Sequence, residues 1–200
     1  MKSLSSITAG LLVIAFSVTG CGHFLPQQGW VTLFDGTSAG LANWDRLGGA
    51  NWRLEDGAVV ADKSSTKGAS FLVSKNAYKD FELRVEFWSS NDANSGIFMR
   101  CKDPKAITDR TCYEANIYDT RPDPSYGTGA IVHRAVVNPM PKAGGKWNVY
   151  EITAIGPEVT VALNGAVTVH MRDSELPSGP IALQYGSGVV KFRKVQIKAL

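Results

Sequence analysis

The sequence predicts an all-β protein, a jelly-roll sandwich built from two antiparallel sheets. Thirteen short segments alternate apolar and polar residues, which is the two-residue period of a strand with one buried face. No window of the mature chain keeps apolar side chains at helical spacing, so only short helical turns are expected. Thirteen strands are too many for one open twisted sheet, and two packed sheets accommodate them.

The expected strands follow one another from Trp30 to Ala199. They are residues 30–34, 51–55, 58–62, 70–74, 81–88, 96–100, 113–118, 129–133, 147–155, 158–164, 166–170, 181–185 and 189–199. Asp56-Gly57 and Asn164-Gly165 separate neighbouring segments and predict tight hairpins, because these pairs tolerate positive φ. In the last segment the apolar positions change parity around Arg193 and Lys194, so a β-bulge is expected there.

The first twenty residues have the pattern of an export signal. Lys2 precedes an apolar run over residues 7–18, which is short for a transmembrane helix. The run ends in Val18-Thr19-Gly20-Cys21, which resembles a bacterial lipobox, although a plain secretory signal cut nearby is the alternative. We therefore expect a lipoprotein signal peptide at residues 1–20, lipidation of Cys21, a tether over residues 21–28 and a domain over residues 29–200.

The same reading predicts a membrane-anchored bacterial lipoprotein in the periplasm or at the cell surface. Gly22 and His23 follow the lipidated cysteine, so the aspartate that retains some lipoproteins at an inner membrane is not there. An outer membrane is the expected location in a host that has one. Loss of Lys2 with the signal lowers the formal charge from +3 to +2, and no basic run interleaves with aromatic residues. Nucleic acid is therefore not an expected partner.

Cys101 and Cys112 are expected to form a disulfide. Once Cys21 is lipidated these two remain, in an exported protein whose surroundings favour oxidation. Two free buried thiols are the alternative. A zinc site is less favoured, because no CxxC motif or nearby pair of histidines supplies further ligands.

The stretch from Asn94 to Asp119 carries the main cluster of candidate site residues. Two expected strands flank the cysteine loop, and each alternates apolar with polar residues. Arg100, Glu114 and Asn116 are expected to project together from one face of a sheet whose other face is packed. An exposed cross-strand ion pair between Glu114 and Arg100 is the structural alternative.

Nine segments in register resemble one known family over residues 29–200. They read GWVTLFDGTSAGLANW, WRLEDGAVVA, YKDFELRVEF, NSGIFMR, YEANIYD, TGAIV, KWNVYEITAIG, VTVALNG and ALQYGSGVVKFRKVQIKAL. Together they are similar to the 3-keto-disaccharide hydrolase domain, formerly a domain of unknown function. The resemblance implies a concanavalin A-like jelly roll whose concave sheet binds sugar. It also implies cleavage of glycosides oxidised to a ketone at C3, in some members by elimination followed by hydration.

Such chemistry needs a base, a cationic stabiliser and an acid, and the resemblance suggests residues for each. A ketone at C3 acidifies the proton at C2, so a modest base can remove it while the C1 substituent leaves. Glu114 is expected to be the base and Arg100 the electrostatic stabiliser. His133 is expected to be the acid, because imidazole exchanges protons near neutral pH.

The remaining candidates have substrate-binding or undecided roles. Asn94, Asn116, Tyr118 and Gln184 are expected to hold sugar hydroxyls, while Tyr185 or Trp52 could stack on a sugar ring. Asp119 is either a turn cap or a further catalytic carboxylate, which could form an acid and base pair with Glu114 or share a divalent cation with it. No other cofactor is expected. The family commonly has a histidine where this chain has Tyr185, which puts any mechanism that needs that histidine in doubt.

A function of a different class also fits these residues. Aromatic and amide side chains on the same sandwich can bind unoxidised glycans without any acid or base. The alternative prediction is therefore a non-catalytic carbohydrate-binding lipoprotein.

Overall fold

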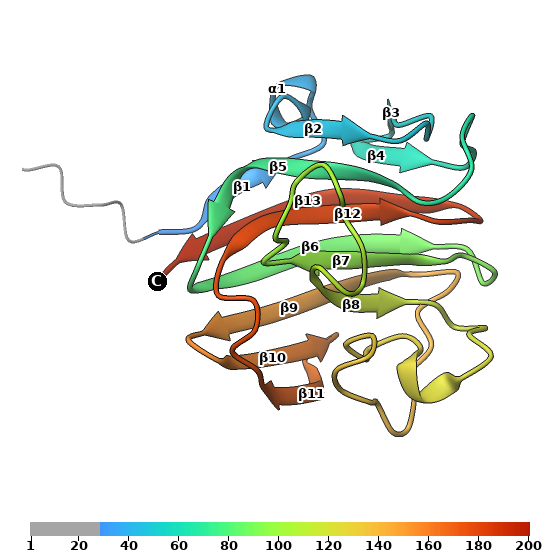
Figure 1. Ribbon diagram of the computed structural model, residues 1–200. Helices are drawn as coiled ribbons and strands as arrows, with labels where there is room; N and C mark the ends of the chain where they lie inside the picture. Colours follow the sequence, from blue (N-terminus) through green and yellow to red (C-terminus); the bar gives the residue numbers. More distant parts are fainter. Residues whose placement is uncertain (1–28) are drawn as a thin grey trace, which may run out of the picture.

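The computed structural model describes residues 29–200 and shows two antiparallel sheets packed face to face (Figure 1). The predicted signal peptide, the lipidation site Cys21 and the tether lie outside the described residues. The elements are β1 (Val31–Phe34), α1 (Ser38–Leu41), β2 (Trp44–Leu47), β3 (Arg53–Glu55), β4 (Ala58–Ala61), β5 (Ser70–Tyr78), β6 (Phe81–Ser89), β7 (Ser95–Met99), β8 (Tyr113–Ile117), the 3-10 turn η1 (Pro124–Tyr126), β9 (Trp147–Ile155), β10 (Glu158–Leu163), β11 (Ala166–Arg172), β12 (Gly179–Tyr185) and β13 (Val190–Ala199).

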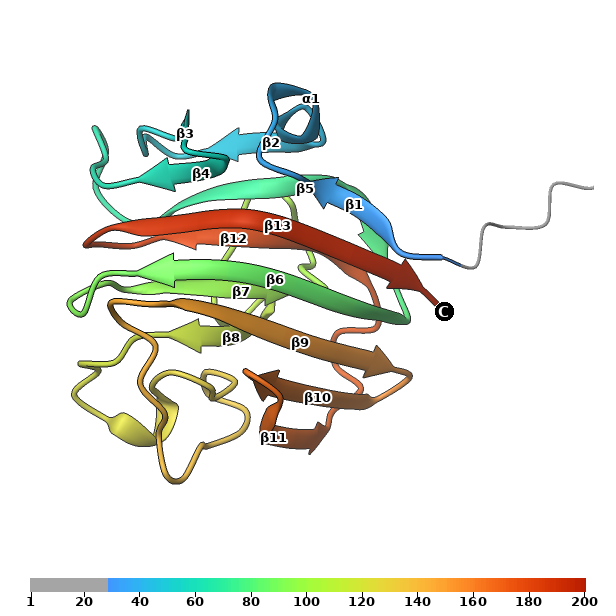
Figure 2. The same cartoon turned by 180° about the vertical axis from the view of Figure 1, so that it is seen from behind.

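The larger sheet has eight strands and the smaller one has five. In the larger sheet the order is β11-β10-β9-β6-β13-β4-β3, and β1 also pairs with β13. The smaller sheet has the order β2-β5-β12-β7-β8. Figure 2 looks at the eight-stranded sheet, and the five-stranded sheet lies behind it. The predicted all-β fold of two antiparallel sheets is therefore confirmed. Within residues 29–200 no helix is long and apolar enough to cross a membrane.

The core lies between the sheets because each strand alternates inward and outward side chains. In β6, Phe81, Leu83, Val85 and Phe87 are all at most 1% exposed and pack in this core. Fully burying such a side chain stabilises the fold by about 1.5–3 kcal/mol. The disulfide between Cys101 and Cys112 is present, as predicted.

The predicted turns and the bulge are also found. Asp56-Gly57 joins β3 to β4 and Asn164-Gly165 joins β10 to β11, with positive φ at all four residues. In the pairing of β13 with β6, Phe192 lies opposite Phe87 and Lys194 opposite Glu86. Arg193 is the extra residue in β13, so the β-bulge predicted from the change of apolar parity is confirmed.

One predicted strand is absent, and one strand was not predicted. Residues 129–133 form only a bridge to β8 through Ile131, because the chain turns back there and the amide of Ala135 donates to the carbonyl of Ile131. Residues 44–47 form β2, which the alternation did not reveal because Asp45 and Arg46 interrupt it at a sheet edge.

A loop over residues 100–112 crosses the outer face of the five-stranded sheet, the face turned away from the core (Figure 1). Ile107 of this loop and the disulfide pack in a second apolar cluster with Phe71, Phe98 and Ala182. The loop is therefore held against the sheet at both its ends and its middle.

Candidate functional site

Gly96 forms the floor of a group of polar side chains on the outer face of the five-stranded sheet. Asn116 lies directly opposite Gly96 in β8. On the other side, Leu183 pairs with Ile97, which brings Gln184 of β12 beside Gly96. Glu114 leans over the glycine, since an alanine Cβ at position 96 would lie 2.7 Å from Glu114 Oε1. We call Gly96, Glu114, Asn116 and Gln184 the Gly96 site.

The Gly96 site presents oxygen acceptors that have no partner among residues 29–200. Asn116 Oδ1 and Gln184 Oε1 are both buried without a hydrogen bond there. The other end of the Asn116 amide is fixed, because Nδ2 donates to the carbonyl of Tyr126 at 2.7 Å. A buried acceptor left unpaired costs about 1–3 kcal/mol. Hydroxyl groups of a ligand would supply the missing donors.

Glu114 is the carboxyl group of the Gly96 site, and its pKa is strongly raised. Its side chain is buried, and only 6% of the residue is exposed. Burial, and to a lesser extent the charge of Asp109, raise the pKa of Glu114 to about 8 against the opposing charge of Arg121. No hydrogen bond contributes to this shift. At neutral pH the protonated, uncharged form therefore predominates.

His133 and Asp109 form a pair beside Glu114. His133 Nε2 lies 3.1 Å from Asp109 Oδ2, and its ring lies 5.9 Å from that of Tyr126. The amide of Val132, the residue before it, donates to the carbonyl of Glu114 at 3.1 Å. A carboxylate at Nε2 holds the proton on that nitrogen and leaves Nδ1 as an acceptor. The pair thus has the orientation of a supported base.

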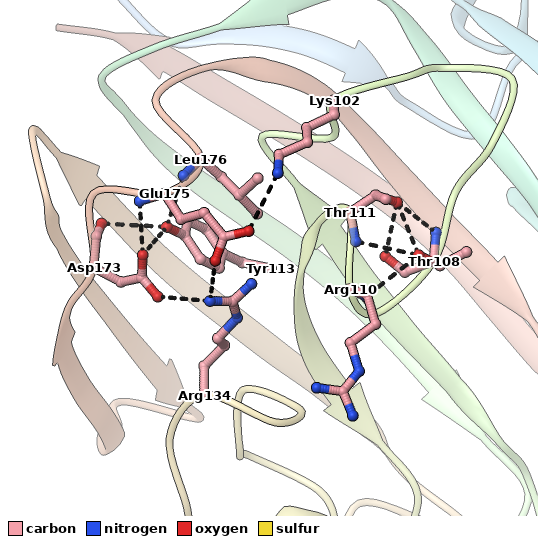
Figure 3. A network of polar contacts seen from close by, with 9 residues as sticks. All are labelled: Lys102, Thr108, Arg110, Thr111, Tyr113, Arg134, Asp173, Glu175 and Leu176. Atoms are coloured by element: carbon pink, nitrogen blue, oxygen red, sulfur yellow. Dashed lines mark hydrogen bonds and ion pairs between the residues drawn. The ribbon is translucent and has the colours of Figure 1, made fainter.

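A polar network anchors both halves of this pair (Figure 3). Arg134, the neighbour of His133, contacts Asp173 at 3.1 Å and Glu175 at 2.5 Å. Lys102, where the cysteine loop begins, reaches the same Glu175 at 3.2 Å. The network joins the turn that carries His133 and the loop that carries Asp109 to one segment, residues 173–176.

Tyr113 forms the buried end of this network. Its hydroxyl donates to Asp173 Oδ1 at 2.8 Å and accepts from the amide of Leu176 at 3.1 Å. Burial raises the pKa of Tyr113 to about 12.

Asp109 lies in a turn that two threonines hold in place. The hydroxyls of Thr108 and Thr111 lie 2.9 Å apart and stabilise this turn (Figure 3). Asp109 therefore reaches His133 from a fixed turn.

Arg100 does not join Glu114, contrary to the expected geometry. β7 ends at Met99, and Arg100 has a positive φ of 53°, which breaks the alternation that placed it beside Glu114. Its fully buried guanidinium donates to the carbonyls of Lys79, Gly156 and Leu176. It also lies 3.3 Å from Asp80. Arg100 therefore crosslinks three connecting segments through their backbone carbonyls. The cation whose charge acts on Glu114 is Arg121.

Asp119 occupies a different position from Glu114. Its carboxylate accepts from the Thr128 hydroxyl at 2.6 Å and from the amides of Ala143 and Gly144. The Asp119 carboxylate therefore crosslinks two distant loops, which is neither the predicted cap of its own turn nor a carboxylate shared with Glu114. Among residues 29–200 no three His, Cys, Asp or Glu side chains gather as a metal site.

Of the other predicted sugar-binding residues, two lie on the same outer face as the Gly96 site and two lie in the core between the sheets. Strand alternation places Asn94 and Tyr118 on the outer side, and both are half-buried. Tyr185 follows Gln184 and points the opposite way, where its ring meets Trp52 at 6.5 Å in the core. The expectation that Tyr185 or Trp52 stacks on a sugar is therefore wrong, because both rings are buried between the sheets.

The sequence reading missed Asp109, Arg121 and Tyr126. Asp109 and Arg121 lie in loops and Tyr126 ends the 3-10 turn η1, so strand parity gives no direction for any of them. The available signal was the disulfide, because Asp109 comes three residues before Cys112 and must stay near the start of β8.

Several solved structures with the same fold come from carbohydrate-related proteins. A protein of Parabacteroides distasonis ATCC 8503, provisionally assigned as a glycosyl hydrolase, is 19% identical with a TM-score of 0.73, covering 86% of this chain and 95% of that one. A second such protein from the same organism is 24% identical with a TM-score of 0.69, covering 86% and 100%. The carbohydrate binding module CBM66 from Bacillus subtilis is 17% identical with a TM-score of 0.57, covering 86% and 96%. At these identities the likeness establishes the fold, a galectin-like jelly roll.

Sequence comparison identifies the family. No curated protein matches the chain. A family model described as a 3-keto-alpha-glucoside-1,2-lyase-like domain matches residues 29–198, which is nearly all of the described structure. The expected resemblance is confirmed, and this chain belongs to the family of 3-keto-alpha-glucoside-1,2-lyase-like domains.

Proposed function

We propose that this protein cleaves 3-keto-glycosides by elimination across C1 and C2, outside the cytoplasm. The observation that carries the proposal is Glu114, a buried carboxyl group with a raised pKa, on a glycine floor beside the supported His133–Asp109 pair. Family membership and the carbohydrate-related structures of the same fold support a sugar ligand.

The reaction requires one proton to leave the sugar and another to arrive. A base removes the proton from C2, and the electron pair of that bond forms the C1=C2 double bond. The bond from C1 to the aglycone oxygen breaks, and this oxygen leaves with a proton from an acid. Addition of water to the double bond then gives the free 3-keto sugar. Charge that develops on the C3 oxygen needs a nearby donor or cation.

The geometry favours roles opposite to those first assigned from the sequence. Glu114 carries a proton at neutral pH, so it suits the acid that protonates the leaving oxygen. His133, held by Asp109, suits the base. Asn116 and Gln184 offer unpaired oxygens to sugar hydroxyls. Arg121 replaces Arg100 as the candidate cation.

Release of an aglycone from an oxidised sugar tests the function. A 3-keto-glucoside of 4-nitrophenol should release nitrophenol with the protein, whereas the unoxidised glucoside should not. The unoxidised compound is the matched control, because it lacks the ketone that acidifies C2. Binding of unoxidised glycans without turnover of the keto sugar would instead support the carbohydrate-binding alternative.

Asp109→Asn should lower kcat and move the alkaline limb of the pH profile. The amide no longer supports the His133 imidazolium, so a loss of about tenfold to a hundredfold is expected. Removing the charge of Asp109 also lowers the pKa of Glu114, because that charge raises it. The alkaline limb should therefore shift to lower pH. Asp103→Asn, in the same loop, is the control and should change neither value. An unmoved limb would contradict the coupling of Asp109 to Glu114.

Gly96→Ala should damage the site more than the fold. The new Cβ would lie 3.0 Å or less from the Glu114 side chain, which can swing aside because it is flexible. Stability should fall by about 1 kcal/mol, measured by urea unfolding, while turnover falls at least about tenfold. Gly29→Ala meets open space and serves as the control. Full turnover in Gly96→Ala would show that the position of Glu114 is unimportant.

A further inference from the structure

Three of the five tryptophans lie on the outer face of the eight-stranded sheet, the face turned away from the core and from the five-stranded sheet that carries the Gly96 site. Trp88 in β6 lies directly opposite Trp147 at the start of β9. Trp30, just before β1, lies under Arg84, whose side chain projects from the same face of β6. Trp30 is 44% exposed and Trp147 is 38% exposed. Large aromatic side chains left exposed on one face indicate an interaction surface.

Each of these tryptophans has a cation over its ring. Arg193 lies 4.2 Å from the ring centre of Trp147, Lys191 lies 5.5 Å from that of Trp88, and Arg84 lies 5.6 Å from that of Trp30. The bulge in β13 makes the first contact possible, because it adds Arg193 as an extra residue next to β6. The backbone geometry of the bulge therefore places the Arg193 side chain next to the ring of Trp147.

The same face has a surplus of positive charge on its central strands β6, β9 and β13. The three glutamates there are already paired: Glu151 with Arg84, Glu86 with Arg193, and Glu82 with Lys198. Among residues 29–200 no carboxylate pairs with Lys191 or Lys194. The face therefore has two lysines available for an anionic partner.

The chain enters the domain at this face. Trp30 is the second described residue, and β1 runs along the edge formed with β13. The segment between Cys21 and Gly29 can span at most about 30 Å when fully extended. A lipid anchor at Cys21, as predicted, would hold this face within that distance of a bilayer.

The chemistry of the face suits a bilayer better than a glycan. Sugars stack on open aromatic faces, and here cations already lie over the three rings. Tryptophan beside lysine and arginine is typical of membrane interfaces, where indole sits at the headgroup level and cations meet lipid phosphates. We propose that the outer face of the eight-stranded sheet, around Trp30, Trp88 and Trp147, docks on the headgroups of an anionic phospholipid bilayer. This proposal does not depend on the enzymatic function.

Vesicle binding by residues 29–200 tests it without any anchor. This part contains the complete core between the two sheets. It should sediment with vesicles of mixed phosphatidylglycerol and phosphatidylcholine, should bind pure phosphatidylcholine much more weakly, and should be released by high salt. Lys191→Glu with Lys194→Glu should weaken binding at least about tenfold. Trp147→Ala should weaken it as well and should reduce the blue shift of tryptophan fluorescence on binding.

The control reverses the same charge on the opposite side of the molecule. Lys105→Glu with Arg110→Glu changes two exposed cations of the cysteine loop, which crosses the outer face of the five-stranded sheet. This variant should keep most of the binding. Equal weakening in both double variants would mean that overall charge alone matters, and would overturn the proposal. So would absence of binding to the anionic vesicles, or binding to soluble glycans that Trp147→Ala abolishes.

Discussion

Glu114→Gln should lower kcat for 3-keto-glycoside cleavage at least about a hundredfold, because an amide cannot donate a proton to the leaving oxygen. The wild-type rate should also fall about tenfold for each pH unit above the pKa of Glu114, which is about 8. The residual rate of the variant should lack this alkaline limb. Stopped assays from pH 5 to 10 with a methyl 3-keto-glucoside measure both effects, because its alkoxide leaving group needs that proton whereas 4-nitrophenolate leaves without one.

The same substitution should stabilise the fold at alkaline pH. The pKa of Glu114 is about 8 in the folded protein and 4.5 by default, so the folded state holds this proton more tightly. Below about pH 4.5 both states are protonated and ionisation contributes nothing. Between the two pKa values the wild type loses stability as the pH rises, and above about pH 8 the loss is complete. Gln cannot ionise, so at pH 9 the variant should be more stable by about 3 to 5 kcal/mol.

Urea unfolding at pH 5 and pH 9 checks this difference. Glu151→Gln is the matched control, since Glu151 is exposed and ion-paired on the other sheet. It should change neither turnover nor the pH dependence of stability. Normal turnover in Glu114→Gln would remove its role as the acid. An equal stability difference at both pH values would mean that burial does not raise its pKa.

Arg100→Met should destabilise the domain by about 3–5 kcal/mol. The substitution leaves three carbonyl oxygens without these donors, the buried one of Leu176 and the partly buried ones of Lys79 and Gly156. Asp80 also loses its cation. Urea unfolding measures the effect. Arg84→Met removes an exposed pair with Glu151 and should cost less than about 1 kcal/mol.

Activity of the Arg100 variants separates the structural role from the catalytic one first expected. Arg100→Lys keeps the charge but cannot bond three carbonyls in a planar fork, so it should also be destabilised. Both variants should retain turnover under conditions where they remain folded. A stable but inactive Arg100 variant would restore the expected role in catalysis.

Strand alternation correctly predicted the direction of side chains within regular strands, but it failed for residues beyond the end of a strand. Glu114, Asn116 and Gln184 alternate with core residues, and the structure brings them together around Gly96. Strand alternation would place Arg100 on the same face as Glu114, but its positive φ redirects the side chain. Tyr185 fails for the opposite reason, because regular alternation points it away from Gln184.

Loop residues could not be placed from the sequence at all. The pairing of Asp109 with His133 depends on a turn at each residue and on contacts from segments far away in the chain. Arg134 reaches Asp173 and Glu175 some forty positions further on, and such contacts leave no periodic pattern. The bulge at Arg193 was predictable because it shifts the period of the strand that contains it.

The bridge between residues 129–132 and β8 has a consequence for solubility. β8 is the last strand of its sheet, and an open strand edge can recruit a strand from another molecule. Here the carbonyl of Ala130 and the amides of Gly129 and Val132 occupy the hydrogen-bonding positions of Asn116 and Glu114. The turn then carries the chain away at Ala135, so pairing cannot continue outward. The segment that supplies His133 therefore also protects this edge against aggregation.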